Sequence, residues 1–216
     1  MQHPDQTSAS TPHRDRAGRP ALHIDALCVF RGSVLVIDRL THHQKGGEIC
    51  CITGANGIGK STLLRTLAGR LTADSGRIEC DRVRIYVGHA DGLSSAISGR
   101  ENLRSWAQIY GLPDTHEALD QALTGFAATG FADLPVRLLS RGQRRRLALA
   151  RLCLSPADSL WLLDEPNAGL DQAANERLDQ VITAHVAGGG MVLAATHLPL
   201  ARSAPQSRLV LGGAAA

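Results

Sequence analysis

The sequence predicts an α/β domain in which helices cover both faces of a largely parallel sheet. Three runs have no polar face, as is typical of central strands: residues 48–53 (EICCIT), 160–163 (LWLL) and 191–196 (MVLAAT). Helical patterns separate these runs along the chain, and this alternation indicates a parallel sheet. A chain of 216 residues is long enough for one such domain with its own core, but too short for a second of similar size.

The first half of the chain adds a tail and an antiparallel piece. Residues 1–20 are polar and contain three prolines, which predicts a disordered tail ahead of a single domain over 21–216. Leu22, Ile24 and Ala26 alternate with polar residues, and residues 34–37 form a second apolar run. We expect these two half-buried strands to be an antiparallel piece at one edge of the sheet, and residues 84–87 to be a further short strand.

Helical patterns fill the remaining segments. They cover residues 60–69, two stretches within 98–130 separated by Gly111-Leu112-Pro113, residues 140–154 and residues 171–186. The helices within about 92–154 stand between two strands of the sheet, so we expect them to form a small helical lobe.

Composition excludes several classes of protein. No stretch approaches the roughly 20 apolar residues of a membrane-spanning helix, and the polar N-terminus lacks the apolar core of a secretory signal. The five cysteines include no CxxC pair, which indicates a reduced, intracellular protein. The net charge of +3 is too small to favour any class of partner.

A phosphate-binding motif follows the first apolar strand. Residues 54–61 (GANGIGKS) match GxxxxGK[ST] between a strand and a helix. The glycines allow backbone N–H groups to surround phosphate oxygens, Lys60 supplies a cation for the β- and γ-phosphates, and Ser61 offers a hydroxyl to Mg²⁺. The alternative is a glycine-rich turn that contains Lys and Ser by chance.

Two carboxylates follow the second apolar strand, at the end where α/β sheets bind ligands. Asp164 is expected to hold Mg²⁺, and Glu165 to polarise the water that attacks the γ-phosphate. Alone, the pair could be solvated acids at the start of a loop. Combined with the phosphate-binding motif, it predicts a nucleotide hydrolase.

Residues 139–143 (LSRGQ), followed by RRRLALARL, narrow the prediction. They resemble the LSGGQ signature of the ABC ATPase family, a group of P-loop NTPases. The resemblance implies that Ser140, Gly142 and Gln143 contact the γ-phosphate of ATP bound to a second copy of the chain. Arg141 departs from the family, which has a small residue there. Without the resemblance, Ser140 would be a simple helix N-cap.

Other positions agree with the family pattern. Residues 168–171 (AGLD) resemble its D-loop, and His197 follows the third apolar strand, where the family has a histidine that reaches the γ-phosphate. Phe30 could stack under adenine or belong to the core. His89 stands where the family has a glutamine, which leaves its contact with nucleotide open.

The resemblance therefore implies ATP and Mg²⁺ as ligands and assigns each site residue. Glu165, His197 and Lys60 are catalytic, and Ser61 and Asp164 hold the metal. The nucleotide-binding residues are Gly54, Ala55, Asn56, Gly57, Ile58, Gly59, Lys60, Ser61, Thr62, Ser140, Gly142, Gln143 and Asp171.

Within the family, the Gly88-His89 pair, the run at 143–152 and residues 196–200 (THLPL) resemble the haem-exporter ATP-binding subunits of cytochrome c biogenesis, the CcmA type. This implies integral-membrane partners of the CcmB and CcmC type and a peripheral location on the cytoplasmic face of the bacterial inner membrane. No haem ligand is evident, since His42 and His43 are expected to be solvated. The alternatives are a subunit for another cargo, such as a lipid or drug, and a soluble ABC ATPase acting on nucleic acid.

Overall fold

The computed structural model describes residues 21–212, so the predicted tail over residues 1–20 lies outside the described residues. The strands are β1 (Leu22–Arg31), β2 (Val34–Gln44), β3 (Ile49–Thr53), β4 (Ser75–Cys80), β5 (Arg84–Val87), β6 (Leu160–Asp164), β7 (Met191–Ala195) and β8 (Gln206–Val210). The α-helices are α1 (Lys60–Leu67), α2 (Gly99–Ile109), α3 (His116–Gly125), α4 (Arg141–Ala150) and α5 (Gln172–Ala187). Short 3₁₀ turns are η1 (Thr129–Phe131), η2 (Val136–Leu138) and η3 (Arg151–Leu154).

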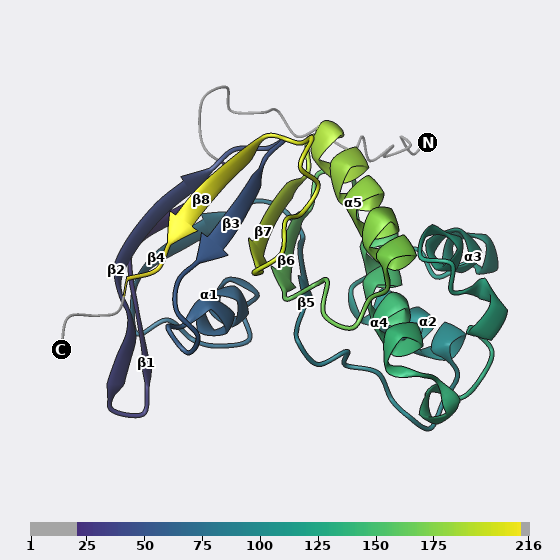
Figure 1. Cartoon of the computed structure of the whole chain (residues 1–216). Coiled ribbons are helices and arrows are strands. Elements are labelled where there is room, and N and C mark those ends of the chain that lie inside the picture. The colour runs from purple at the N-terminus through teal and green to yellow at the C-terminus, as the bar shows by residue number, and fades with distance from the viewer. Residues whose placement is uncertain (1–20, 213–216) are drawn as a thin grey trace, which may run out of the picture.

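The α/β prediction is confirmed by a five-stranded sheet in the order β5-β6-β7-β3-β8, in which every pair is parallel. Helix α1 covers one face of this sheet and α5 lies on the other (Figure 1). The carboxyl ends of β3, β6 and β7, where the predicted phosphate-binding loop and carboxylates begin, therefore lie at one edge of the sheet.

Alternate residues of the central strands feed two separate cores, because successive side chains point to opposite faces. On one face, Ile52, Leu162 and Leu193 pack with Leu63, Leu64 and Leu67 of α1. On the other, Leu163 and Ala194 pack with Leu178 of α5 and with the helices of the lobe. Burial of one such leucine contributes about 2 kcal/mol, so both layers are fixed by the apolar runs of the sequence.

The early antiparallel strands form a sheet of their own, in the order β2-β1-β4, rather than an edge of the parallel sheet. The expected inward position of Ala26 is wrong. Ala26 adopts a left-handed φ of 43° at an irregularity of the pairing and is exposed, while Leu27 and Val29 are buried instead. The bulge shifts the buried set of residues by one position, which simple alternation cannot predict.

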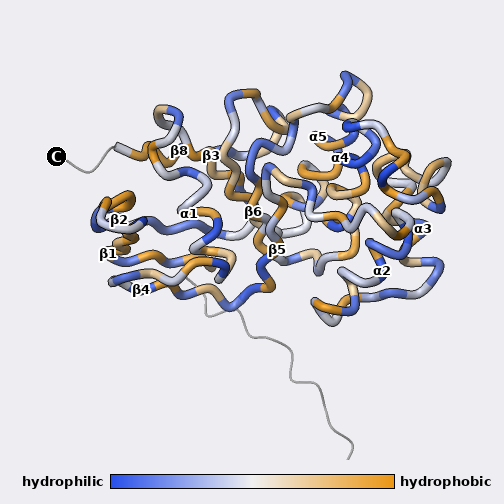
Figure 2. Tube along the Cα trace, turned by 90° about the horizontal axis from the view of Figure 1, so that it is seen from below, coloured by the Kyte–Doolittle hydropathy of each residue, from blue (hydrophilic) through white to orange (hydrophobic). Residues whose placement is uncertain are grey.

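Helices α2, α3 and α4 gather at the end of the molecule opposite the antiparallel sheet, as the views in Figures 1 and 2 both show. Arg100 on α2 links this group, because its guanidinium pairs with Asp120 on α3 and Asp133. Within residues 21–212, every helix is too short or too polar to span a bilayer.

Three local predictions need correction. The helix predicted over 140–154 is α-helical only to Ala150 and continues as the 3₁₀ turn η3. Strands β4 and β8 were not predicted, since their sequences SGRIEC and QSRLV contain few apolar residues. The apolar run over 48–53 predicts that both of its cysteines are buried, but only Cys50 is, and Cys51 is half-buried.

Candidate functional site

The loop between β3 and α1 is shaped by three glycines. Gly54, Gly57 and Gly59 have φ values of 146°, 79° and 114°, which L-residues rarely adopt. A Cβ at Gly59 would lie 2.6 Å from Val36 Cγ1, so this position also needs glycine for space. Around Gly57 there is open space instead. The loop is thus packed against β2 at its end and open at its middle.

Lys60 reaches back over this loop from the first turn of α1. Its Nζ donates hydrogen bonds to the carbonyl oxygens of Gly54 at 2.8 Å and Ala55 at 3.1 Å. Lys60, Ser61 and Thr62 form the first turn of the helix, where backbone N–H groups have no partner within the helix. The ammonium group and the positive end of the helix dipole together make this loop a strong anion site.

Asp164 and Glu165 stand at the end of β6 in different environments. Asp164 is only 3% exposed, and its Oδ2 has no hydrogen-bond partner among the residues that the structure describes. Glu165 adopts a left-handed φ of 47°, and its N–H donates to the Ala195 carbonyl oxygen at 2.8 Å. A buried, unpaired carboxylate oxygen is suited to a hard divalent cation, whereas the Glu165 carboxylate is partly open to solvent.

His197 and Asn56 converge with Glu165. His197 Nε2 lies 3.2 Å from Asn56 Oδ1 and 3.6 Å from Glu165 Oε1. These three side chains come from the loop after β3, the end of β6 and the segment after β7, which are far apart in the sequence. Such a meeting of strand ends is where open α/β sheets bind their ligands, so the structure brings together three of the predicted site residues.

Ser140 caps α4, as the alternative interpretation of its role states. Its Oγ accepts a hydrogen bond from Gln143 N at 3.2 Å, and Gln143 Oε1 accepts one from Ser140 N at 2.8 Å. This is a capping box. Ser140 is nevertheless exposed, so its hydroxyl is accessible from outside the chain.

The structure does not bring Ser140 to the loop over 54–62. Both views place α1 and α4 on opposite sides of β5 and β6 (Figures 1 and 2). The start of α4 lies instead against the segment after β6, because a Cβ at Gly142 would be 3.1 Å from the Gly169 carbonyl oxygen. Arg141 lies beside Gly169 as well. One chain therefore presents the two predicted phosphate-binding elements on separate surfaces.

Asp171 is the N-cap of α5, and its Oδ1 accepts a hydrogen bond from Ala174 N at 2.8 Å. Before it, Asn167 links two elements: its Nδ2 donates to Asn175 Oδ1 at 2.9 Å, and its Oδ1 accepts from Thr196 Oγ1 at 3.4 Å. The segment between β6 and α5 is thus tied to the residue that precedes His197.

The two residues of uncertain role are both exposed. Phe30 is 44% exposed, so the alternative that it belongs to the core is wrong. Its backbone N–H donates to Asp74 Oδ2 at 2.7 Å, which fixes the end of β1. His89 is also exposed, directly after Gly88, whose carbonyl oxygen accepts a hydrogen bond from Arg145. Both aromatic rings are free to meet a ligand.

Arg145 was not among the predicted site residues, although it contacts the backbone of Asp164 and Glu165. A signal was present in the sequence. Arg145 lies at helical spacing with Leu149 and Leu152, and therefore on the buried stripe of its helix. Arginine is almost never fully buried unless it is paired, so its position on that stripe indicates buried acceptors.

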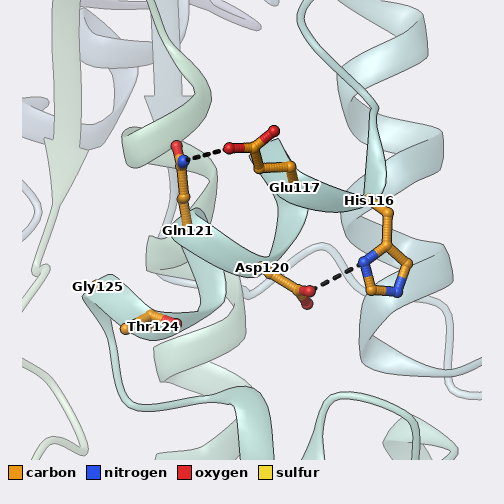
Figure 3. Close-up of a pocket in the computed structure, with 6 residues that line it drawn as sticks. All are labelled: His116, Glu117, Asp120, Gln121, Thr124 and Gly125. Atoms are coloured by element: carbon orange, nitrogen blue, oxygen red, sulfur yellow. Dashed lines mark hydrogen bonds and ion pairs between the residues drawn. The ribbon is translucent and has the colours of Figure 1, made fainter.

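A hollow of about 760 Å³ on the outer side of α3 contains none of these residues. Figure 3 shows its polar side chains in contact with one another: His116 pairs with Asp120 at 2.9 Å, and Gln121 donates to Glu117 at 3.4 Å. Because Asp120 also pairs with Arg100, this surface is part of the packing of the helical group.

Comparison with known proteins identifies relatives. A family model described as ABC transporter matches residues 37–168. The cytochrome c biogenesis ATP-binding export protein CcmA of Gluconobacter oxydans is 44% identical over 179 residues, which cover 83% of this chain and 82% of that protein. The protein of the same name from Xanthomonas oryzae pv. oryzae is 40% identical over 207 residues, covering 91% and 96%.

A solved structure described as the ATP binding subunit of an ABC transporter superposes with a TM-score of 0.78. The superposition covers 88% of this chain and 85% of that one, at 23% sequence identity. At this identity the likeness concerns the fold alone, and it agrees with the architecture described above.

Proposed function

The chain belongs to the ABC transporter family, and from this premise we propose that it is the ATPase subunit of the complex that exports haem, or releases a haem-loaded chaperone, in cytochrome c biogenesis. As a member of the family it binds ATP and couples ATP hydrolysis to transport. The observation that carries the proposed cargo is the identity of 40–44% with proteins named for cytochrome c biogenesis, over most of the length of each chain.

The nucleotide roles are proposed residue by residue. Residues 54–62 surround the phosphates of ATP, with backbone N–H groups and the Lys60 ammonium as donors. The accessible middle of the loop at Gly57 and the position of Lys60 over it support this assignment. We place residues 21–216 in one ATP-binding domain, with a helical lobe over about 92–154.

Mg²⁺ would be held by Ser61 and Asp164. The buried Asp164 Oδ2 without a partner fits such an ion, since a carboxylate in that position needs a cation or a donor. When bound, Mg²⁺ neutralises charge on the β- and γ-phosphates.

Glu165 is the group that orients and polarises the attacking water, and His197 is the group that faces the γ-phosphate. Their proximity at 3.6 Å supports a shared task at one point. Asn56 lies against His197 and orients its ring. Water is then activated by Glu165 on the side of the γ-phosphate opposite the leaving oxygen.

The site is completed by a second copy of the chain. The separation of the Ser140 surface from the loop over 54–62 within one chain supports this arrangement, in which two copies associate head to tail and each caps the other's ATP. Gly142 and Gln143 accompany Ser140, and Asp171 lies at the adjoining segment. The integral-membrane partners are of the CcmB and CcmC type, and the chain binds them peripherally at the cytoplasmic face of the bacterial inner membrane.

The test uses a bacterium that lacks its own ATPase subunit of this pathway but keeps the membrane subunits. Expression of the chain should restore covalently haem-bound cytochrome c, measured by haem staining of gels, and Glu165→Gln should not. The chain should also co-purify with the membrane subunits. Failure of both restoration and co-purification, with ATP hydrolysis intact, would assign the subunit to another cargo.

A further inference from the structure

The Arg145 side chain is the most completely bonded group near the carboxylates. It projects from α4 into the protein and is only 2% exposed. Its guanidinium makes five hydrogen bonds, which equals the number of N–H donors that arginine possesses. An arginine bonded in this way has one orientation, and it holds in place the backbone segments whose oxygens accept its hydrogen bonds.

Three of the five acceptors are consecutive carbonyl oxygens at the end of β6. Nη2 donates to Asp164 at 3.3 Å and to Glu165 at 2.7 Å, and Nε donates to Pro166 at 3.2 Å. The guanidinium therefore holds the main chain before, at and after Glu165.

The other two acceptors lie after β5. Nη1 donates to the Gly88 carbonyl oxygen at 2.8 Å and to Asp91 Oδ1 at 3.3 Å. Burial lowers the pKa of Arg145, while the nearby Asp91 carboxylate raises it. The Asp91 carboxylate thus offsets part of the cost of burying the cation, and the segment over 88–91 anchors the guanidinium from the other side.

Glu165 needs such support because its backbone is strained. A left-handed φ of 47° costs a residue with a Cβ about 1 kcal/mol or more. The backbone conformation sets the direction of the Cα–Cβ bond, and in this conformation the carboxylate points toward His197. The N–H of Glu165 is held by Ala195 and its carbonyl oxygen by Arg145. If Glu165 were extended, its hydrogen bonds to Ala195 and Arg145 could not both keep their present geometry.

We propose that Arg145 is a positioning residue for ATP hydrolysis: it holds the Glu165 backbone in the left-handed conformation that aims the carboxylate at the attacking water. The inference rests on the proposed role of Glu165. Arg145 itself touches neither nucleotide nor water in the reaction. Lysine cannot replace it, because an ammonium group lacks the planar fork that bonds three carbonyls at once.

The experiment measures ATP hydrolysis by the assembled complex for Arg145→Lys and for a matched control. Arg145→Lys keeps the charge and should lower kcat by about 10- to 100-fold, as expected for a misplaced catalytic group, with KM for ATP within about twofold. The control is Arg151→Lys. Arg151 is also buried, but its hydrogen bonds go to the carbonyl oxygens of Asp91 and Gly92, and Arg151→Lys should keep kcat within about twofold.

A double variant separates positioning from a general effect on folding. In a Glu165→Gln background, Arg145→Lys should lower the residual rate no further, since the group that it positions is already lost. The double variant should also still form the MgATP-bound dimer, because the cap of α4 is unchanged. Additive losses, or loss of that dimer, would make Arg145 a structural residue and overturn the inference.

The outcomes distinguish the two proposals. A kcat of Arg145→Lys near that of the wild type, or an equal loss in Arg151→Lys, overturns the positioning role and leaves the proposed function intact. Hydrolysis by Glu165→Gln at the wild-type rate overturns the proposed role of Glu165 and, with it, the positioning role of Arg145.

Discussion

The adjacent carboxylates of Asp164 and Glu165 can have different roles because they lie in different surroundings. Asp164 is the last residue of β6 and points into the protein, where one of its oxygens has no protein partner among the described residues. Glu165 leaves the strand with a left-handed backbone, and its carboxylate meets solvent and His197. The buried carboxylate is suited to an ion and the open one to water.

We expect Asp164→Asn to have opposite effects with and without Mg²⁺. Without ligand, the variant should unfold at the wild-type temperature or above it, because a buried unpaired charge has been removed. With ATP, the Mg²⁺ concentration for half-maximal hydrolysis should rise at least about tenfold, as expected for loss of one charged ligand. Thermal unfolding and Mg²⁺ titrations of hydrolysis measure these effects, with the exposed Asp25→Asn as control. Unchanged Mg²⁺ dependence would remove Asp164 from the metal site.

His185 makes the stability of the protein depend on pH. Its ring stacks on Trp161 with centroids 3.6 Å apart, its Nε2 lies 3.0 Å from the Ser159 carbonyl oxygen, and burial lowers its pKa to about 4. The unfolded chain, with a histidine pKa near 6.5, takes up the proton more readily than the folded protein. The contribution to stability is therefore complete above about pH 6.5 and is lost as the pH falls toward 4.

From pH 7.5 to pH 5, this histidine should remove about 2 kcal/mol from the free energy of unfolding. Urea denaturation of the wild type and of His185→Gln at both pH values measures it. The difference between the two proteins isolates His185 from the other titrating groups. Parallel loss of stability in both would show that the folded protein protonates His185 as easily as the unfolded chain does.

Helices α2 and α4 begin with the same device, used in two different places. Ser98 and Glu101 form a capping box at α2, as Ser140 and Gln143 do at α4. Ser98 lies where the helical group packs on itself, whereas Ser140 faces out of the chain. Comparing Ser98 with Ser140 therefore distinguishes the contribution of an N-cap to stability from a role in binding phosphate.

Ser98→Ala and Ser140→Ala should each lower the free energy of unfolding by about 1 kcal/mol, the usual cost of losing an N-cap. Only Ser140→Ala should also lower ATP turnover in the complex, since only its hydroxyl is proposed to meet the γ-phosphate. Urea denaturation and steady-state hydrolysis of both variants test this. Equal ATP turnover of the two variants would mean that Ser140 acts only as a helix N-cap.

The elements that could be predicted from sequence are those whose signal is local. Strands β3, β6 and β7 are apolar because both their faces are covered, and the start of α4 shows its cap directly. Strands β4 and β8 lie at sheet edges, and their extended form depends on pairing with β1 and β3, which are distant in sequence. Edge strands need few apolar residues, so their sequences give little sign of them.

The same distinction applies to the site. The motifs over 54–61 and at Asp164 and Glu165 are contiguous, so they could be found in the sequence. The contact of His197 with Asn56 joins residues 141 positions apart, and the Arg145 fork reaches two segments across the fold. Such contacts follow from the packing of α4 against the sheet, which no local pattern encodes.

At the scale of the whole molecule, the two apolar cores place the chemistry on different surfaces. The core beneath α1 supports the phosphate-binding loop, which packs against β2. The core of the helical group supports α4, which lies on the far side of β5 and β6 (Figure 1) and has the exposed Ser140 at its start. A rigid body of this form cannot fold Ser140 onto its own loop. Two copies related by a twofold axis can present each surface to the other twice.

This arrangement predicts a specific cross-link between copies. A disulfide requires Cα atoms within about 7 Å, so cysteines at Ala55 in one copy and Ser140 in another can join only if the two surfaces meet. Ala55 and Ser140 are both exposed. Both cysteine variants also carry Glu165→Gln, which should hold the ATP-bound dimer closed, and Cys153→Ser, which removes an exposed thiol. Copies with Ala55→Cys and copies with Ser140→Cys are mixed and oxidised. A covalent dimer should form with MgATP and not with ADP, because only the γ-phosphate bridges both surfaces.

A Ser98→Cys copy in place of Ser140→Cys should give no product, since Ser98 belongs to the packing of the helical group. A cross-link independent of nucleotide, or none under any condition, would mean that the loop and the start of α4 do not share a ligand, and would contradict the proposed head-to-tail dimer.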